Sequence, residues 1–338
     1  MADPPSEATS VAAELAQIAS ASAPVADRVD AMLGELHRLV PYSGADLAIL
    51  DSDRREFETL RMIGCSDRIR DYFHQPAFYA DIEIAGMDRN RPPMCVRDLP
   101  VPRGELRVWA DYLEPAGFRE GVGVTLFAPD GRHLGLLSLL TDDPRGPDDA
   151  TRDFIGTLVP LIANAIDPMR SVGALARMVT DARAGVLLTR SGHVVALPGL
   201  SVEDPLLRPG SPVLAVAAAV LDAGQTHVPF LAPDGPVHVR VTVLACPSDV
   251  PRHLQAVVLV SPSGDLHGLT PRELEMLGLV IEGWTNARIA RHAYITERTV
   301  ATHLEHILAK LAVTSRTLAA VRALRLGLYV PYRLSPTR

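Results

Sequence analysis

The stretch that decides the fold is residues 269–316, which read LTPRELEMLGLVIEGWTNARIARHAYITERTVATHLEHILAKLAVTSR. Thr270, Pro271 and Glu273 predict a helix start, because a threonine N-cap and a glutamate three residues later satisfy free backbone amides reciprocally. Apolar residues then recur at helical spacing until Gly283, a residue type that commonly ends helices. The sequence therefore predicts one capped helix that ends at this glycine.

Two more helices follow at close spacing. Thr285 and the asparagine after it cap a short helix over residues 287–292, and a turn at residues 293–295 leads into a longer helix that runs to about residue 311. A short helix, a tight turn and a longer helix form a helix-turn-helix. A fourth helix is predicted over residues 315–326.

This stretch resembles the LuxR-type (GerE) DNA-binding domain of bacterial transcriptional regulators. The resemblance covers the last fifth of the chain and implies a homodimer that binds double-stranded DNA at a two-fold promoter operator, with RNA polymerase as a further partner. Eighteen correctly spaced positions carry it: Leu269, Thr270, Arg272, Glu273, Leu277, Gly283, Asn286, Ile289, Ala290, Thr299, Val300, His303, Ile307, Lys310, Leu311, Val313, Ser315 and Arg316.

The predicted third helix suits insertion into a major groove, because one face is apolar and the other shows small or polar side chains. Hydroxyls at the starts of the second and third helices are placed to hold phosphates. Lys310 and Arg316 suit phosphate contacts and pairing with Glu273 or the helix ends equally well. The DNA-binding candidates are Thr285, Asn286, Thr296, Arg298, Thr299, Val300, Ala301, Thr302, Glu305, His306 and Lys310.

Two of these positions depart from the family pattern. Relatives often carry lysine or arginine at the positions of Ala301 and Glu305, and a carboxylate repels a nearby phosphate. An alternative is therefore a signalling or protein-interaction module whose helix-turn-helix has lost DNA binding. Tyr294 stands in the turn, where many such domains place glycine.

The charge of the chain is unevenly spread. The net charge is −7, but residues 268–338 hold ten basic and five acidic residues, and residues 1–267 hold 23 and 35. Residues 268–338 thus carry a net charge of +5 and residues 1–267 a net charge of −12, which indicates that the C-terminal part binds a polyanion. Lys310 is the only lysine, so no P-loop lysine or receiver-type phosphorylation site precedes it. This excludes an ATP-dependent regulator and a response regulator.

The N-terminal module has the element order of a GAF domain, which it resembles over residues 20–168. Helix 11–39 is followed by two strands, an irregular aromatic region over residues 65–98, two more strands, and a closing helix that Pro160 kinks. Residues 1–12 are expected to be disordered, and the domain to span 13–170. The four strands are predicted over residues 45–50, 57–63, 122–127 and 134–140.

The middle module, residues 184–262, has the order of a PAS-like domain. Two strands, an apolar helix over residues 212–222 and three more strands follow a linker helix over residues 171–183. The DNA-binding domain is assigned to residues 265–338. The expected fold class is thus multidomain α+β, with GAF-like and PAS-like α/β sensor modules before an all-α, four-helix LuxR-type domain. A quorum-sensing receptor would have one acyl-homoserine-lactone domain before its helix-turn-helix, so it agrees less well with the two modules expected here.

The sensor modules are expected to respond to a small ligand or a partner. The candidate ligand pocket is lined by aromatic residues, although such residues more often form core, and the dimer contact uses apolar residues of the fourth helix. Helices 25–39 and 154–178 are candidates for joining two sensors. The pocket candidates are Tyr72, Phe78, Tyr79, Trp109 and Tyr112, and the dimer candidates are Leu318, Val321 and Leu324.

Other classes of function find no support in the sequence. Cys65, Cys95 and Cys246 are odd in number and far apart, so neither a disulfide framework nor a metal site is expected. No cofactor and no catalytic residue is predicted. The longest apolar run, residues 213–221, is too short for a membrane span, and the N-terminus has no secretory pattern, so a cytoplasmic protein that is not an enzyme is expected.

Overall fold

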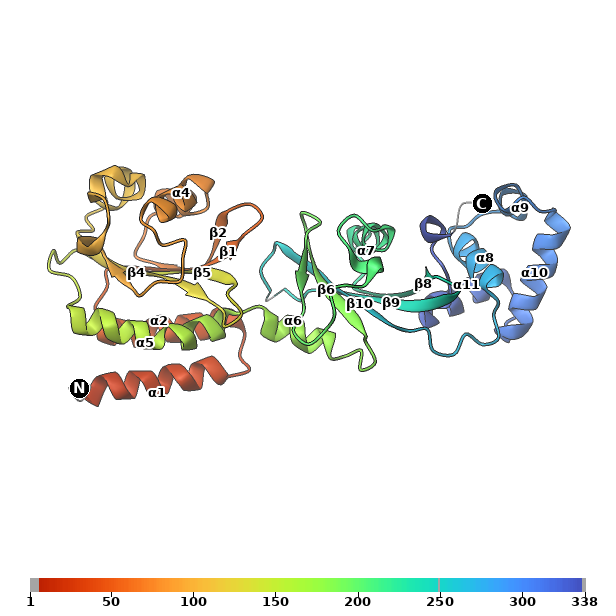
Figure 1. Cartoon of the computed structure of the whole chain (residues 1–338), viewed down its shortest axis with the longest axis horizontal. Helices are drawn as coiled ribbons and strands as arrows, with labels where there is room; N and C mark the ends of the chain where they lie inside the picture. Colours follow the sequence, from red (N-terminus) through yellow and green to blue (C-terminus); the bar gives the residue numbers. More distant parts are fainter. Residues whose placement is uncertain (1–5, 249, 336–338) are drawn as a thin grey trace. The chain divides into compact units, whose positions relative to one another are not determined.

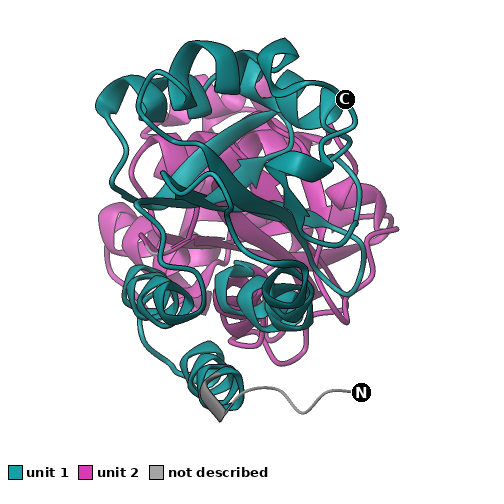
Figure 2. Cartoon of the chain, turned by 90° about the vertical axis from the view of Figure 1, so that its left-hand side faces the viewer, with its two compact units in different colours: residues 1–168 teal, residues 169–338 magenta. Residues whose placement is uncertain are grey.

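The computed structural model of the chain describes residues 6–248 and 250–335. The chain divides into two compact units, residues 1–168 and residues 169–338, shown in different colours in Figure 2. Each unit is built around one five-stranded antiparallel sheet. In both sheets the first hairpin lies beside the last strand, and the remaining strands continue from there.

Unit 1 is a layered α/β domain (Figure 1). Its sheet has the order β2-β1-β5-β4-β3. Alternate residues of each strand face opposite sides, so β1 sends Ala45 and Leu47 into one core and Ala48 and Leu50 into the other. The strands are β1 (Gly44–Asp51), β2 (Glu56–Ile63), β3 (Met94–Cys95), β4 (Glu120–Phe127) and β5 (His133–Thr141).

Helices cover both faces of this sheet. On one face α2 (Val25–Leu39) and α5 (Asp149–Ile166) pack on the strands, with α1 (Ser6–Ser20) beneath them. On the other face lie short aromatic elements around a second core. These are α3 (Asp67–Phe73), α4 (Pro76–Ile84) and a π-helical segment, Val108–Leu113, with the 3-10 turns η1 (Val96–Asp98) and η2 (Arg103–Glu105) nearby.

Three expectations for the N-terminal half are wrong. Residues 6–12 belong to α1 rather than to a disordered end, since Val11 and Leu15 are buried against the core, while residues 1–5 lie outside the described residues. The single helix over residues 11–39 is two helices, broken before Pro24. The irregular region at residues 65–98 contains α3 and α4, which are too short to show a helical period.

The closing helix is also shorter than predicted. It ends at Ile166 because Asp167 is extended before Pro168, and a proline cannot donate to the helix. A separate helix, α6 (Met169–Ala176), opens unit 2, so a continuous helix over residues 154–178 does not exist. Pro160 is accommodated inside α5.

Unit 2 begins with the second sheet, of order β7-β6-β10-β9-β8. Helix α6 packs on one face, and α7 (Pro212–Asp222) packs on the other, where Ser211 caps its N-terminus. The strands are β6 (Ala184–Thr189), β7 (Val194–Ala196), β8 (His227–Asp234), β9 (Val237–Ala245) and β10 (Leu254–Pro262), with a 3-10 turn η4 (Pro205–Leu207) before α7.

Four helices and a short turn complete unit 2, which confirms the expected fold class of two α/β regions before a helical domain. Threonine or serine caps each of the four helices through its side chain. The helices are α8 (Pro271–Ile281), α9 (Asn286–Ala293), α10 (Glu297–Lys310) and α11 (Arg316–Leu326), followed by the 3-10 turn η5 (Tyr332–Leu334).

The helical domain and the second sheet share one hydrophobic core. Buried residues of β8 and β9, such as Phe230 and Val241, belong to the same cluster as Leu277 of α8 and Ala323 of α11. The compact unit therefore includes both, and the three-domain boundaries stay a prediction.

Candidate nucleic-acid interface

The turn between α9 and α10 closes without a glycine. Tyr294 caps α9 in the left-handed conformation, with φ 54° and ψ 43°, and its side chain is 85% exposed. The Ile295 amide donates to the Ala290 carbonyl at 3.0 Å, which completes the turn. A tyrosine in this conformation costs about 1 kcal/mol, and the helix-turn-helix geometry forms nevertheless.

Helix α10 has one buried face and one exposed face. Val300, Ile307 and Leu311 are buried at 1% exposure or less, as the apolar stripe predicted. Val300 was also a DNA-binding candidate, and that assignment is wrong because a fully buried side chain cannot reach a base. The exposed face presents Arg298, Thr302, Glu305 and His306, with Ala301 and Thr299 half-buried beside them.

The hydroxyl groups near the helix starts are engaged locally. Thr285 accepts a hydrogen bond from the Arg288 amide, and Thr296 accepts one from the Thr299 amide at 3.1 Å. Thr302 donates to the Arg298 carbonyl at 3.2 Å. These bonds fix the threonines at the solvent side of α9 and α10, where a phosphate can approach the first-turn amides.

Lys310 lies in an ion pair with the capping-box glutamate. Its ammonium donates to Glu273 Oε2 at 2.7 Å and to Oε1 at 3.0 Å, and the Glu273 side chain is 3% exposed. Burial opposes ionisation, but the bonds from Lys310 and Thr270 outweigh it and lower the pKa of the Glu273 carboxyl. Of the two roles open to Lys310, the structure shows the pairing with Glu273.

Arg316 is likewise used within the domain. Its guanidinium donates to Asn286 Oδ1 at 2.9 Å and to the Trp284 carbonyl, so both Arg316 and the candidate Asn286 hold α11 against the start of α9. Burial lowers the pKa of the Arg316 guanidinium. One acceptor position of Asn286 Oδ1 is therefore used within the domain, and the role of Asn286 in DNA binding stays a prediction.

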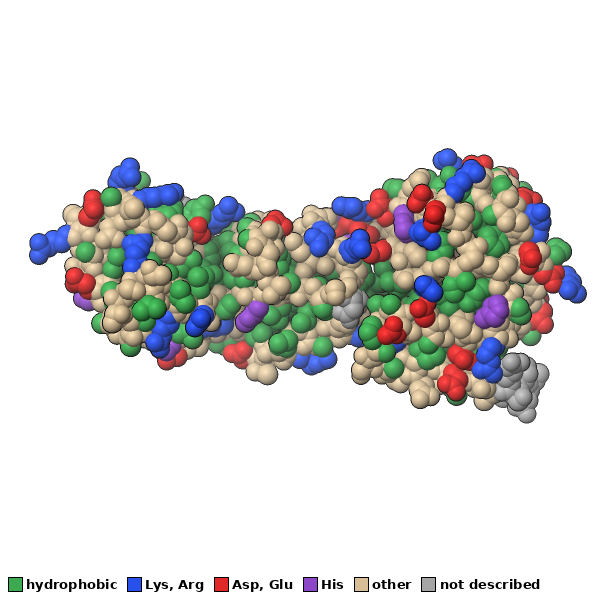
Figure 3. Space-filling view, turned by 180° about the vertical axis from the view of Figure 1, so that it is seen from behind, with side chains coloured by type: hydrophobic (Ala, Val, Ile, Leu, Met, Phe, Trp, Pro, Cys, Tyr) green, Lys and Arg blue, Asp and Glu red, His purple; other side chains and the backbone are tan. Residues whose placement is uncertain are grey.

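Two exposed cations of α9 were missed by the sequence reasoning. Arg288 stacks on Trp284 with its guanidinium carbon 3.9 Å from the ring centroid, and Arg291 lies one turn further along, also exposed. The sequence signal that could have revealed them is their three-residue spacing within a short capped helix, which places both arginines on one face. Figure 3 shows several cationic side chains, drawn in blue, on the visible face of this domain at its left-hand end.

Comparison with known proteins identifies this domain. Residues 267–323 match the model of the bacterial regulatory proteins, luxR family. The C-terminal domain is a LuxR-type helix-turn-helix domain.

Curated relatives match over this LuxR-type domain and little more. The transcriptional regulatory protein LiaR of Bacillus subtilis is 54% identical over 57 residues, 17% of this chain and 27% of that protein. The nitrate/nitrite response regulator NarL of Escherichia coli is 47% identical over 57 residues, 17% and 26%. The probable regulator GfsR of Streptomyces halstedii is 34% identical over 133 residues, 36% and 50%. The chain thus spans about a quarter to a half of the relatives it matches.

Solved structures were found for larger parts of the chain at low scores. A GAF domain from an Acinetobacter phosphoenolpyruvate-protein phosphotransferase has a TM-score of 0.38 and 12% identity, covering 52% of this chain and 99% of that one. Escherichia coli SdiA has a TM-score of 0.36 and 16% identity, covering 95% and 98%. The fold here is defined by the strand orders and packing described above.

The fourth helix of the LuxR-type domain has an unpartnered apolar face. Leu318, Val321 and Leu324 of α11 are 49%, 40% and 40% exposed, whereas Ala319 and Ala323 on the opposite face are buried. All three dimer candidates therefore lie together on the surface of unit 2, at the three-residue spacing of one helix face, and the dimer contact itself stays a prediction.

A short C-terminal segment fastens the LuxR-type domain to the second sheet. We call residues 327–330 the docking segment. The Leu231 amide of the edge strand β8 donates to the Tyr329 carbonyl at 2.8 Å, and the Val330 amide donates to Leu274 of α8 at 3.2 Å. Arg240 of β9 donates to the carbonyls of Leu326 and Ser263. The segment thus covers part of an edge that is otherwise free to pair.

The pocket candidates of unit 1 divide into two groups. Phe78 and Trp109 line an apolar cavity of about 80 Å³. Tyr72 is core: its hydroxyl donates to Asp81 at 2.8 Å and its ring stacks on Tyr112. Tyr79 stacks on Phe57 instead. Burial, together with the hydrogen bond to Asp81, raises the pKa of the Tyr72 phenol.

The described part of the chain contains neither a metal-binding cluster nor a membrane-spanning helix. Within it, no three His, Cys, Asp or Glu side chains are grouped so as to hold a metal ion. None of the described helices has both the length and the apolar character needed to cross a bilayer.

Proposed function

We propose that the chain is a sequence-specific DNA-binding transcriptional regulator that acts as a homodimer on a two-fold operator. The observation that carries this is the exposed face of α10: Arg298, Thr302, Glu305 and His306 lie in solvent at the start and middle of a helix whose other face is buried. These side-chain types read base edges, with arginine suited to guanine and glutamate to cytosine.

The rest of the domain supports this role. The amides at the starts of α9 and α10, capped by Thr285 and Thr296, suit phosphate contacts, and Arg291 adds an exposed positive charge. The patch Leu318–Val321–Leu324 suits a second copy of the domain, which would place two α10 helices about one DNA turn apart. RNA polymerase fits as a later partner of the DNA-bound dimer.

The α/β regions are proposed to act as the sensor. Unit 1 contains an apolar cavity next to a polar groove, which suits a small ligand, and the absence of a lysine before Lys310 leaves binding or association as the trigger. SdiA has been solved in complex with octanoyl-rac-glycerol. A cytoplasmic location fits a protein whose proposed partner is promoter DNA.

The test is binding of the full chain to promoter DNA of its neighbouring genes by fluorescence anisotropy. The double variant Arg298→Ala/Thr302→Ala is expected to weaken binding about 10- to 100-fold, because each lost base contact removes about 1–3 kcal/mol. Arg54→Ala, which removes the same charge from a β1–β2 turn in unit 1, is the matched control. Equal affinities of both variants and the parent would refute the proposal.

The second candidate function, an interaction module without DNA binding, is favoured by Ala301 and Glu305. These place a methyl and a carboxylate on the α10 face, where a phosphate contact would need a cation. No binding to any promoter fragment, together with capture of a protein that depends on the α10 face, would support that alternative.

A further inference from the structure

Two adjacent hollows in unit 1 differ sharply in chemistry. The first is the apolar cavity of about 80 Å³, with Phe78, Trp109 and Ala85 in its wall. The second is an open groove of about 500 Å³ that carries three arginines, Arg97, Arg103 and Arg119, and one acid, Glu120. Val96 and Leu99 line both hollows, so the two hollows meet at these side chains, which we call the wall.

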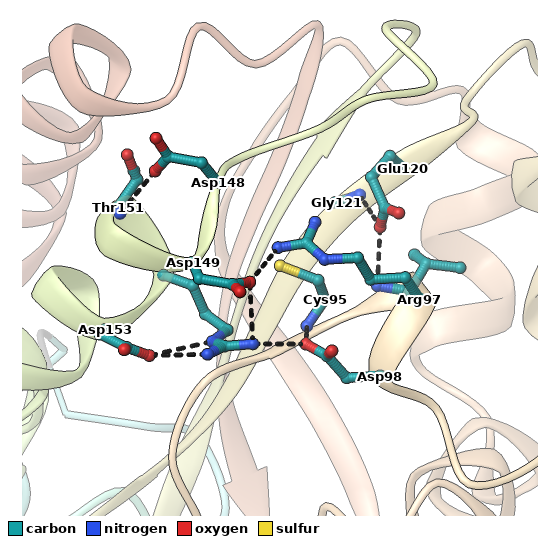
Figure 4. A network of polar contacts seen from close by, with 11 residues as sticks. Cys95, Arg97, Asp98, Glu120, Gly121, Asp148, Asp149, Thr151 and Asp153 are labelled. Atoms are coloured by element: carbon teal, nitrogen blue, oxygen red, sulfur yellow. Dashed lines mark hydrogen bonds and ion pairs between the residues drawn. The ribbon is translucent and has the colours of Figure 1, made fainter.

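The wall is held by a polar network that Figure 4 shows. Asp98 accepts a hydrogen bond from the Cys95 amide at 3.0 Å and from Arg152 of α5 at 3.1 Å, and Arg97 donates to Asp149 at 2.8 Å. Burial opposes ionisation of Asp98, but these partners outweigh it and lower its pKa. The 3-10 turn η1 is thereby fastened to the start of α5, and the wall is preorganised.

The groove is rigid as well. Pro100, Pro102 and Pro144 line it, and each fixes its own backbone dihedral. Glu120 is buried, and its Oε1 accepts hydrogen bonds from the Val96 amide at 2.7 Å and the Gly121 amide at 3.0 Å. The one acid of the groove is therefore turned toward the backbone of the wall.

The positive charges of the groove are only partly neutralised. Arg97 pairs with Asp149, and Arg103 pairs with Glu114 at 2.8 Å. Arg119 is exposed, and the hydrogen bonds recorded for its guanidinium in the described structure go to the carbonyl oxygens of Glu114 and Phe118. Arg103 also donates to the Arg119 carbonyl, which keeps the two arginines close together. A guanidinium has five donors, so Arg119 keeps capacity for an anion.

We propose that the groove and the cavity together bind a small organic anion with a short apolar end. The anionic group lies against Arg119 and Arg103, and the apolar end passes Val96 and Leu99 into the cavity. A cavity of 80 Å³ is about half the volume that holds a benzene ring, so it takes an aliphatic group of a few carbons. The inference deepens the sensor part of the proposed function by naming a ligand class.

The experiment uses the full chain without DNA and measures binding by titration calorimetry. The probes are straight-chain carboxylates from butanoate to octanoate and the matching primary alcohols, which share the apolar end and lack the charge. A carboxylate of this series is expected to bind at least tenfold more tightly than its alcohol. Arg119→Ala should remove that difference while leaving the alcohol unchanged, and Arg54→Ala should change neither.

Ala85→Leu tests the cavity itself. Ala85 is 3% exposed in the cavity wall, and the added carbons occupy the space for the apolar end, so both probe types should lose binding. If this variant fails to fold, the Arg119→Ala comparison still decides. Equal binding of carboxylate and alcohol, no effect of Arg119→Ala, or no binding of any probe would overturn the inference. Promoter binding is measured in a separate experiment. A failure to bind DNA would therefore refute the regulator role without affecting this site, and a failure to bind the carboxylates would refute this site without affecting the regulator role.

Discussion

At the scale of single residues, Asp46 is the most perturbed acid of unit 1. It is fully buried in β1, Thr59 donates to Oδ1 at 3.1 Å, and Oδ2 has no hydrogen-bond partner in the described structure. Burial raises the pKa of its carboxyl to about 7, against the lowering effects of Thr59 and Arg70. Between pH 4 and 7 the folded protein therefore holds a proton that the unfolded chain releases.

We therefore expect the free energy of unfolding to fall by up to about 4 kcal/mol as the pH rises from 4 to 7. Above that window this group should cause no further loss. Asp46→Asn should remove this slope, whereas Asp71→Asn, an exposed acid on α3, should keep it. Urea unfolding at pH 5, 6, 7 and 8, followed by Trp109 fluorescence in a Trp284→Phe background, measures it. Parallel pH profiles for Asp46→Asn and the parent would contradict the assignment.

At the scale of elements, the contact between α8 and the docking segment depends on a missing side chain. A Cβ on Gly278 would stand 1.9 Å from the Val330 carbonyl oxygen, a backbone atom that cannot turn aside. Gly278→Ala is expected to displace the segment and destabilise unit 2 by about 1–3 kcal/mol, as overpacking does. Thermal unfolding followed by Trp284 fluorescence measures this.

The control is Gly34→Ala in α2, where nothing lies within 4 Å of the added carbon. Glycine costs a helix interior about 0.5–1 kcal/mol relative to alanine, so this variant should gain a little stability. Gly278→Ala and Gly34→Ala thus make the same chemical change with opposite expected signs. A gain for both would mean that the docking segment is not held against α8.

The elements also show how far the sequence could predict the fold. Helices α8 to α11 were predicted closely because threonine and serine caps, a helical apolar period and terminal glycines mark them locally. Helices α3 and α4 were missed because seven and nine residues are too few to show a period. The docking segment was missed because its partners, Leu231 and Leu274, are distant in sequence and bond through backbone atoms that no side-chain pattern records.

The candidate site divides in the same way. The helical period of α10 was enough to predict its exposed positions. The contacts of Lys310 and Asn286 could not be decided in the same way, because their partners, Glu273 and Arg316, lie in other helices. Two of the five aromatic pocket candidates, Phe78 and Trp109, line the cavity. The arginines of the groove come from three separate segments around residues 97, 103 and 119, which only the fold brings together.

At the scale of the whole molecule, the unpartnered face of α11 is the proposed contact with a second copy of the chain. In a two-fold interface the same patch serves both subunits, so one substitution is present twice at the contact. Leu318→Glu sets two carboxylates against that patch. It is expected to weaken binding to a two-half-site DNA at least tenfold, because each domain must then bind alone.

Ile84→Glu is the matched control, since Ile84 on α4 is 50% exposed and Leu318 is 49% exposed. Both variants add one charge to an exposed apolar position, but only Leu318 belongs to the α11 patch. Mobility shifts on DNA with one and with two half-sites distinguish them. The parent and Ile84→Glu should bind two half-sites with a steep concentration dependence, and Leu318→Glu should bind both DNAs alike. If Leu318→Glu keeps the steep dependence, the dimer contact lies elsewhere, because a carboxylate pair cannot be buried at a two-fold contact without a large loss of affinity.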